Sequence, residues 1–321
     1  MRRRDLLIRL GLLAGGVGGA WWFRDYVLWR EPEVRLPGGR TAWLPFAEAQ
    51  AATPTVQATV NGRPVRALID SGAQYSVIDR ALFDEMGLTE AVPLPMVAYG
   101  VGGDAQMGRG TTLDVAVGEL TLAGLRTAVL GLGPLAGPEG LAAPLILGQD
   151  VLSRLVLELD AAGRRLRFSS RDGWTPPPDA VEIAVTRTGR ALQTGVTVEG
   201  AEIRAVVDTG ASAVLALTRE TARAAGLFDG RPRQPGRSIV LGGVVRAETA
   251  VARTLTLGDA LFRDVAVAIY DDVSVPGFPK ALVGMGAFEG RQVALDLGGP
   301  RLCVSRLLDV TVGGPPQSAR R

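Results

Sequence analysis

The sequence predicts an all-β protein of two tandem lobes that share one plan. Its 321 residues are too many for one small domain and suit two lobes, each with its own core. The 42 glycines, 20 prolines and 47% hydrophobic residues favour short strands separated by turns. Alternating runs such as residues 55–60 and 194–198 are typical of hairpin strands. An internal repeat makes two similar lobes the expected architecture.

The repeat pairs residues 60–73 with residues 198–211 without a gap, at an offset of 138. Each copy reads as strand, turn and strand, followed by Asp-Ser-Gly or Asp-Thr-Gly. Paired glycines, a hydrophobic stretch ending in glycine and a Leu-Asp turn then follow in both copies, in the same order. Because the order is preserved, we expect the two lobes to differ mainly in their loops.

A helical pattern is clear at one place in each lobe, Asp79 to Met86 and Thr218 to Ala225. The first residue of each is expected to cap the helix, and Gly87 or Gly226 to end it. The whole chain is expected to divide into a signal peptide or N-terminal anchor (1–30), a connecting or pro-like segment (31–53), a first lobe (54–171), a Pro-rich linker (172–180), a second lobe (181–308) and a disordered tail (309–321).

The N-terminus predicts export. Arg3 and Arg4 precede an apolar run, residues 10–23, and resemble the twin-arginine export motif. The small residues 18–20 form an imperfect cleavage site, so removal of the segment and its retention as an anchor both stay open. We expect a periplasmic or otherwise exported protein, either released or attached to the membrane through its N-terminus.

The residue types that are absent exclude several functions. The chain has no histidine, which most nucleophilic hydrolases and zinc enzymes need as base or ligand. Cys303 is the single cysteine, so an intramolecular disulfide is excluded, and we expect a buried packing role for it. The arginines are scattered, which argues against nucleic acid as a partner. We expect neither a metal nor a cofactor.

Two carboxylates remain as candidates for chemistry, Asp70 and Asp208. Each follows apolar strand residues and precedes Ser-Gly or Thr-Gly, which lets the chain turn tightly. A single motif of this kind is ordinarily a plain turn. Its occurrence at equivalent places in both repeats makes the pair a candidate for carboxylate-assisted hydrolysis by water.

These motifs resemble those of the pepsin-like and retroviral-type aspartic peptidases, most closely the retropepsin-like kind duplicated in one chain. The resemblance runs from about Thr55 to Ser305 and is carried by residues 69–73, with Ser76 and Val77, and residues 207–211. It implies two acid-protease β-barrel lobes that form an internal pseudo-dimer with the active-site cleft between them. It also implies a monomer, a polypeptide substrate and no cofactor.

The resemblance assigns roles to individual residues. Asp70 and Asp208 would form a catalytic dyad around one water. Ser71 and Thr209 would lock the two loops by hydroxyl-to-backbone hydrogen bonds, with Gly72, Ala73, Gly210 and Ala211 as further support. The hydrophobic segments that end at Gly148 and Gly284 would pack behind the loops. Hairpins 97–103 and 239–245 would be flaps, with Tyr99, Gly102, Gly103, Gly242 and Gly243 as candidate flap residues. For Tyr99, an ordinary packing role stays open.

The second lobe departs from the pattern. Val214 stands where the first lobe has Ser76, and Met285-Gly286 stands where it has Gln149-Asp150. The leading hypothesis is an exported aspartic endopeptidase with a processing or regulatory role. A non-catalytic peptide-binding module that keeps the fold is the alternative. A third hypothesis has each lobe pair with a lobe of another chain, which the tandem repeat makes unnecessary.

Overall fold

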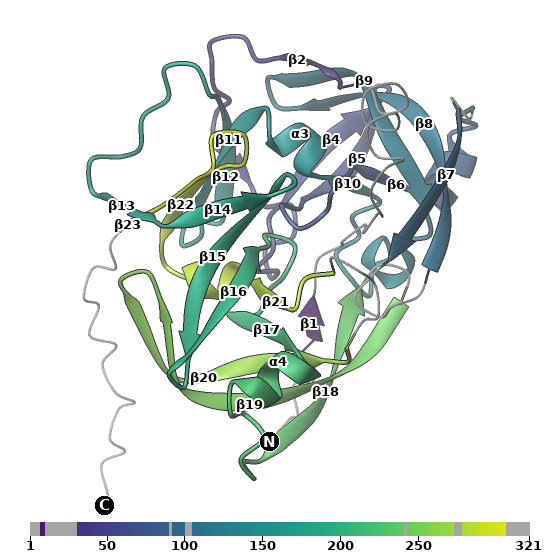
Figure 1. Ribbon diagram of the computed structural model, residues 1–321. Helices are drawn as coiled ribbons and strands as arrows, with labels where there is room; N and C mark the ends of the chain where they lie inside the picture. The colour runs from purple at the N-terminus through teal and green to yellow at the C-terminus, as the bar shows by residue number, and fades with distance from the viewer. Residues whose placement is uncertain are drawn as a thin grey trace, which may run out of the picture.

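The computed structural model describes residues 7–9, 31–89, 92–99, 105–240, 243–272 and 278–305. Its strands form three sheets, one belonging to each lobe and one shared between them (Figure 1). The predicted all-β fold of two lobes is therefore confirmed.

The first lobe is built on an eight-stranded sheet in the order β2-β9-β6-β10-β5-β4-β8-β7. A further pairing of β8 with β9 closes β8, β9, β6, β10, β5 and β4 into a barrel. The strands are β2 (Glu33–Arg35), β4 (Thr55–Val60), β5 (Arg63–Ile69), β6 (Val77–Asp79), β7 (Val92–Tyr99), β8 (Ala105–Val117), β9 (Leu120–Leu130) and β10 (Leu145–Leu147).

The second lobe repeats this plan in a nine-stranded sheet, in the order β1-β18-β19-β20-β17-β21-β16-β15-β14. Here the additional pairing of β19 with β15 closes the barrel. The strands are β1 (Leu7–Arg9), β14 (Val185–Thr188), β15 (Ala191–Val198), β16 (Ala201–Val207), β17 (Leu215–Thr218), β18 (Arg233–Val240), β19 (Gly243–Leu257), β20 (Ala260–Tyr270) and β21 (Ala281–Val283).

The third sheet joins the lobes in the order β13-β23-β22-β11-β12-β3. Its central pair is β11 and β22, which run antiparallel with Leu157 opposite Leu295. The last two strands of each lobe therefore lie in one sheet, which fixes the lobes against each other. The strands are β3 (Leu44–Pro45), β11 (Leu155–Asp160), β12 (Arg165–Ser170), β13 (Ala180–Ile183), β22 (Gln292–Asp296) and β23 (Arg301–Ser305).

Both predicted helices are confirmed. Asp79 caps α2 (Arg80–Glu85) by accepting from the Ala81 amide, and Thr218 caps α4 (Arg219–Ala224) by accepting from the Thr221 amide. Gly87 and Gly226 follow with φ of +60° and +73°, a conformation that glycine adopts at little cost. The described residues also form α3 (Gln149–Leu152) and two 3₁₀ turns, η2 (Gly133–Leu135) and η3 (Met285–Phe288).

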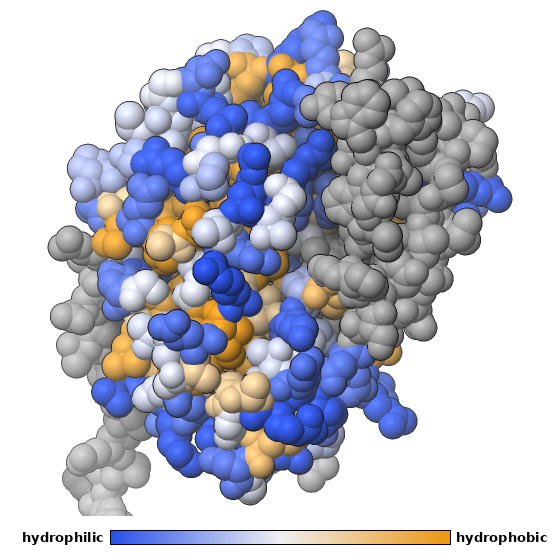
Figure 2. All heavy atoms as spheres, viewed as in Figure 1, coloured by the Kyte–Doolittle hydropathy of each residue, from blue (hydrophilic) through white to orange (hydrophobic). Residues whose placement is uncertain are grey.

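One hydrophobic cluster extends through both barrels and the shared sheet, and includes Leu157 and Leu295. The connecting segment 31–53 contributes β2 and β3 to the edges of two sheets. Among the described residues, no helix is both long and apolar enough to span a membrane. Apart from β1, the predicted signal segment lies outside the described residues, as does the predicted tail. On the face shown in Figure 2, hydrophilic residues are spread widely, with smaller hydrophobic groups between them.

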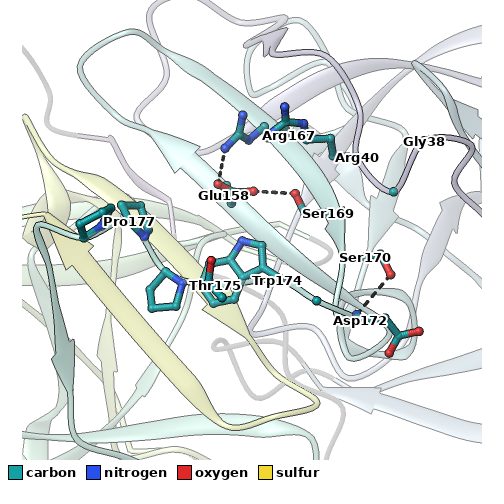
Figure 3. Close-up of a pocket in the computed structure, with 14 residues that line it drawn as sticks. Gly38, Arg40, Glu158, Arg167, Ser169, Ser170, Asp172, Trp174, Thr175 and Pro177 are labelled. Atoms are coloured by element: carbon teal, nitrogen blue, oxygen red, sulfur yellow. Dashed lines mark hydrogen bonds and ion pairs between the residues drawn. The ribbon is translucent and has the colours of Figure 1, made fainter.

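The linker crosses the shared sheet and borders a pocket of about 420 Å³ (Figure 3). At the pocket, Glu158 accepts hydrogen bonds from Arg167 (2.7 Å) and from the Ser169 hydroxyl (2.5 Å). Trp174 packs against a small buried cluster that includes Cys303. The linker is thus held to the sheet by an aromatic anchor, and the one cysteine is buried as the sequence indicates.

Candidate active site

The backbones of both candidate aspartates are held by buried strands. Asp70 follows β5 and donates its amide to Leu147 O at 3.0 Å, while Asp208 follows β16 and donates to Val283 O at 2.8 Å. Leu147 and Val283 end β10 and β21, which run parallel to β5 and β16. The hydrophobic segments before Gly148 and Gly284 therefore lie directly behind the two loops.

Four hydrogen bonds tie the two loops together across the lobe interface. The Ser71 hydroxyl donates to Val207 O (2.8 Å) and accepts from the Thr209 amide (3.0 Å). In the reverse direction, the Thr209 hydroxyl donates to Ile69 O (2.7 Å) and accepts from the Ser71 amide (2.9 Å). These are the hydroxyl-to-backbone bonds that the resemblance implies. The arrangement fixes both aspartates in one frame.

The structure brings the two carboxyl groups together. Asp70 Oδ1 accepts from the amides of Gly72 (2.8 Å) and Ala73 (3.0 Å), and Asp208 Oδ1 accepts from the Gly210 amide (2.8 Å). A Cβ placed on Gly72 would lie 2.6 Å from Asp208 Cγ, and one placed on Gly210 would lie 2.5 Å from Asp70 Oδ2. Each carboxyl thus lies against the glycine of the opposite loop, where only glycine leaves room for it.

The site holds these acids out of water, with Asp70 at 0% and Asp208 at 1% exposure. Burial raises the pKa of Asp208 well above its usual range, and the neighbouring charge of Asp70 raises it further. Two carboxylates at such short range cannot both ionise easily. The pair therefore keeps one proton over a wide pH range.

The first loop has an additional polar support that sequence reasoning did not assign to the site. The Ser76 hydroxyl donates to Asp150 Oδ1 (2.8 Å) and its amide donates to Asp150 Oδ2 (3.0 Å). Gln149 Nε2 donates to Ser71 O (2.8 Å). The signal available was the Gln-Asp pair directly after Gly148, which differs from Met285-Gly286 in the second lobe.

The second loop replaces these side chains with close backbone packing. The amide of Met285 donates to Ala211 O (2.8 Å), as the amide of Gln149 donates to Ala73 O (2.8 Å). A Cβ on Gly286 would lie 2.8 Å from the amide nitrogen of Val214. Two differences from the first lobe therefore compensate each other. Gly286 leaves room for the Val214 backbone in the second lobe, at the position where Asp150 supports Ser76 in the first lobe.

Each lobe packs a tyrosine beside its aspartate loop, but the two tyrosines stand at non-equivalent positions of the repeat. Tyr270 is buried beside Ala211 and donates its hydroxyl to Pro279 O (2.8 Å). Burial raises the pKa of Tyr270, and the Asp208 charge adds to this effect. In the first lobe Leu130 holds the equivalent place, and Tyr75 fills the matching cluster. A buried tyrosine thus borders each aspartate loop, from a different sequence position in each lobe.

The two expected flaps are hairpins. Tyr99 lies opposite Ala105 where β7 meets β8, and Val240 lies opposite Gly243 where β18 meets β19. Gly102, Gly103 and Gly242 lie outside the described residues. In the second lobe, both strands of the hairpin contact η2 of the first lobe, so this hairpin reaches across the lobe interface.

The chain matches one protein family in both lobes. The aspartyl protease family is matched twice, over residues 56–151 and 194–287, and the chain belongs to this family. Solved structures that are similar to the chain include the following two. Basic 7S globulin from soybean is 11% identical, with 84% of this chain and 95% of that chain covered and a TM-score of 0.47. A retropepsin-like aspartic protease from Rickettsia conorii is 20% identical, with 41% and 94% covered and a TM-score of 0.28. No curated protein sequence matches the chain.

The bonds between the loops give a stability prediction. Thr209→Val keeps the side-chain shape but leaves the Ser71 amide and Ile69 O without their partner. Because unpaired buried polar groups are costly, we expect the free energy of unfolding to fall by about 2–4 kcal/mol. Urea denaturation measures this, with Thr209→Ser, which keeps the hydroxyl, as the control. Equal stability of Thr209→Val and the parent would show that these bonds do not hold the lobes.

Proposed function

We propose that this protein is an aspartic endopeptidase that hydrolyses peptide bonds with a water activated between Asp70 and Asp208. The observation that carries the proposal is the closeness of two buried carboxyl groups, each lying against the glycine of the opposite loop. Family membership supports it, because both repeats keep their aspartate.

In the proposed reaction, the ionised Asp70 takes a proton from the water as its oxygen attacks the peptide carbonyl carbon. The protonated Asp208 donates its proton to the carbonyl oxygen, which gives a tetrahedral diol. Asp70 then gives the proton that it took to the amide nitrogen, while Asp208 takes one from a diol hydroxyl. The C–N bond breaks, and a carboxylic acid and an amine are released. The raised pKa of Asp208 supports this division of roles, since that residue must begin as the acid.

We place this activity in the periplasm or another exported location, in the processing or regulation of other proteins. The support for this placement is the Arg3-Arg4 pair followed by an apolar run. Cleavage of the N-terminal segment would release the protein, and retention would keep it at the membrane.

The test exposes the purified chain to an unbiased peptide mixture from acidic to neutral pH and records two quantities. These are the new peptide ends formed and the peptides that the protein retains. New ends that are absent with Asp70→Asn support the peptidase. Retained peptides without any new ends would overturn the proposal in favour of a peptide-binding module.

A further inference from the structure

Gln149, the first residue of α3, is a buried polar side chain to which the proposed reaction gives no part. It is 2% exposed, and both its backbone and its side chain bond to the first aspartate loop. Its amide donates to Ala73 O and its Nε2 donates to Ser71 O, each at 2.8 Å. Gln149 thus holds two carbonyl groups of the loop that carries Asp70.

The side-chain bond continues to the Asp70 carboxyl group through one peptide group. Ser71 O belongs to the same peptide group as the Gly72 amide, and this amide donates to Asp70 Oδ1 at 2.8 Å. A carbonyl that accepts a hydrogen bond makes the amide of its own peptide group a stronger donor, because hydrogen bonds in series polarise one another. Hydrogen bonds to a carboxylate favour its ionised form. This hydrogen-bond relay therefore stabilises negative charge on Asp70.

The second lobe has no such donor at the equivalent position. Met285 stands there, and its amide donates to Ala211 O (2.8 Å) as the amide of Gln149 does to the first loop. A methionine side chain carries no N–H or O–H group, so it cannot donate to the Thr209 carbonyl. The peptide group that precedes the second loop glycine therefore receives no such bond from this side chain. The two aspartates differ in what supports their loops from behind.

We infer that Gln149 is a positioning residue that makes Asp70 the preferred site of the negative charge in the dyad. It acts through a peptide group of the first loop and does not touch the carboxyl group itself. The inference rests on the proposed function, in which Asp70 begins as the base, and it gives a structural reason for that choice. The two repeats carry the same Asp-Ser/Thr-Gly motif, so the difference arises from the residue after each hydrophobic segment.

Other titratable groups lie close to this loop. Asp208 faces Asp70 across the lobe interface and interacts with it directly. Asp150 lies on α3, and the buried tyrosines Tyr75 and Tyr270 border the loops. A phenol releases its proton only above about pH 10, so the tyrosines do not take part in an acidic titration. The carboxyl groups do, and the test therefore includes a background in which Asp70 is replaced.

The first test records kcat/KM against pH for the best-cleaved peptide, with the parent, Gln149→Met and Gln57→Met. The last variant makes the same change at an exposed residue of β4 and should match the parent. In Gln149→Met we expect the acidic limb to move to higher pH by about 0.3–0.5 units, the share that one bond in series adds to a hydrogen bond with a charged group. The alkaline limb should stay, because Asp70 is ionised on both sides of it. A lower kcat/KM with both limbs unmoved would overturn the inference, because the bond would then only hold the loop.

An unfolding measurement separates this inference from the proposed catalysis, since it needs no cleavage. The relay exists only in the folded protein, so its contribution to stability is present where Asp70 is ionised and is lost as pH falls and Asp70 takes up a proton. In urea denaturation, Gln149→Met should therefore cost more stability at neutral pH than at acidic pH. The same substitution made in Asp70→Asn should cost equal amounts at both.

The outcomes are distinguishable. This pattern, found with a parent that cuts nothing, would support the relay and reject the peptidase. An equal cost of Gln149→Met at both pH values, with Asp70 present, would reject the relay whether or not the parent cuts. A pH-dependent cost that persists in Asp70→Asn would also reject it, because another carboxyl group would then be the one that responds.

Discussion

Asp208→Asn is expected to reduce kcat/KM for peptide cleavage by about 10²- to 10⁴-fold, the range that a positioned acid or base contributes. Asparagine keeps the shape of the side chain and can still accept the hydrogen bond from the Gly210 amide. It cannot deliver the proton that the substrate carbonyl oxygen needs. Kinetics on a single cleaved peptide, with Asp208→Glu as a variant that keeps the acid, measures the effect.

The same substitution is expected to change how stability depends on pH. Because the pKa of Asp208 is raised in the folded protein, the unfolded chain loses this proton at lower pH than the folded protein does. The contribution to stability is fully present below the unfolded pKa of about 3.9 and is lost as pH rises toward the folded value. Asp208→Asn should therefore gain stability over the parent between acidic and neutral pH. Parallel pH profiles of urea unfolding would contradict the raised pKa.

Gly210→Ala is expected to damage both the site and the fold. The added Cβ would lie 2.5 Å from Asp70 Oδ2 and 2.6 Å from Asp70 Cγ, well inside van der Waals contact. Asp70 cannot move away without breaking its bonds from the amides of Gly72 and Ala73. We expect the free energy of unfolding to fall by about 1–3 kcal/mol, the usual cost of overpacking a buried site. A displacement of about 1 Å should also lower kcat/KM about 10²-fold.

Gly195→Ala is the matched control for Gly210→Ala, because Gly195 lies in β15 and a Cβ there would meet no atom within 4 Å. Its stability and activity should remain close to those of the parent. If Gly210→Ala behaves like this control, the Asp70 carboxyl does not lie against Gly210 in solution.

The elements that lie next to the aspartates could be predicted from the sequence because their signals are local and repeated. Asp-Ser-Gly and Asp-Thr-Gly each follow a short apolar strand. The position of one motif in its repeat therefore predicts the position of the other. The caps at Asp79 and Thr218 and the glycines after the helices are likewise local signals.

The features that sequence reasoning missed depend on contacts between distant residues. Pairing of β11 with β22 joins residues of two lobes, and either strand alone reads as the end of its own lobe. The exchange of Tyr75 for Tyr270 also has no local pattern. The Gln149-Asp150 pair is visible in the sequence, but its contact with Ser76 joins residues that are 74 positions apart.

A mixing experiment distinguishes a dyad formed by Asp70 and Asp208 of one chain from aspartates that act singly or between chains. Cleavage of one peptide is measured with the parent, with Asp70→Asn, with Asp208→Asn and with an equal mixture of the two variants. If the dyad forms within one chain, the parent cuts the peptide, and both variants and their mixture are inactive. Full activity of either variant, or recovery of cleavage on mixing, would contradict it, because the reaction would then need only one aspartate or a lobe from another chain.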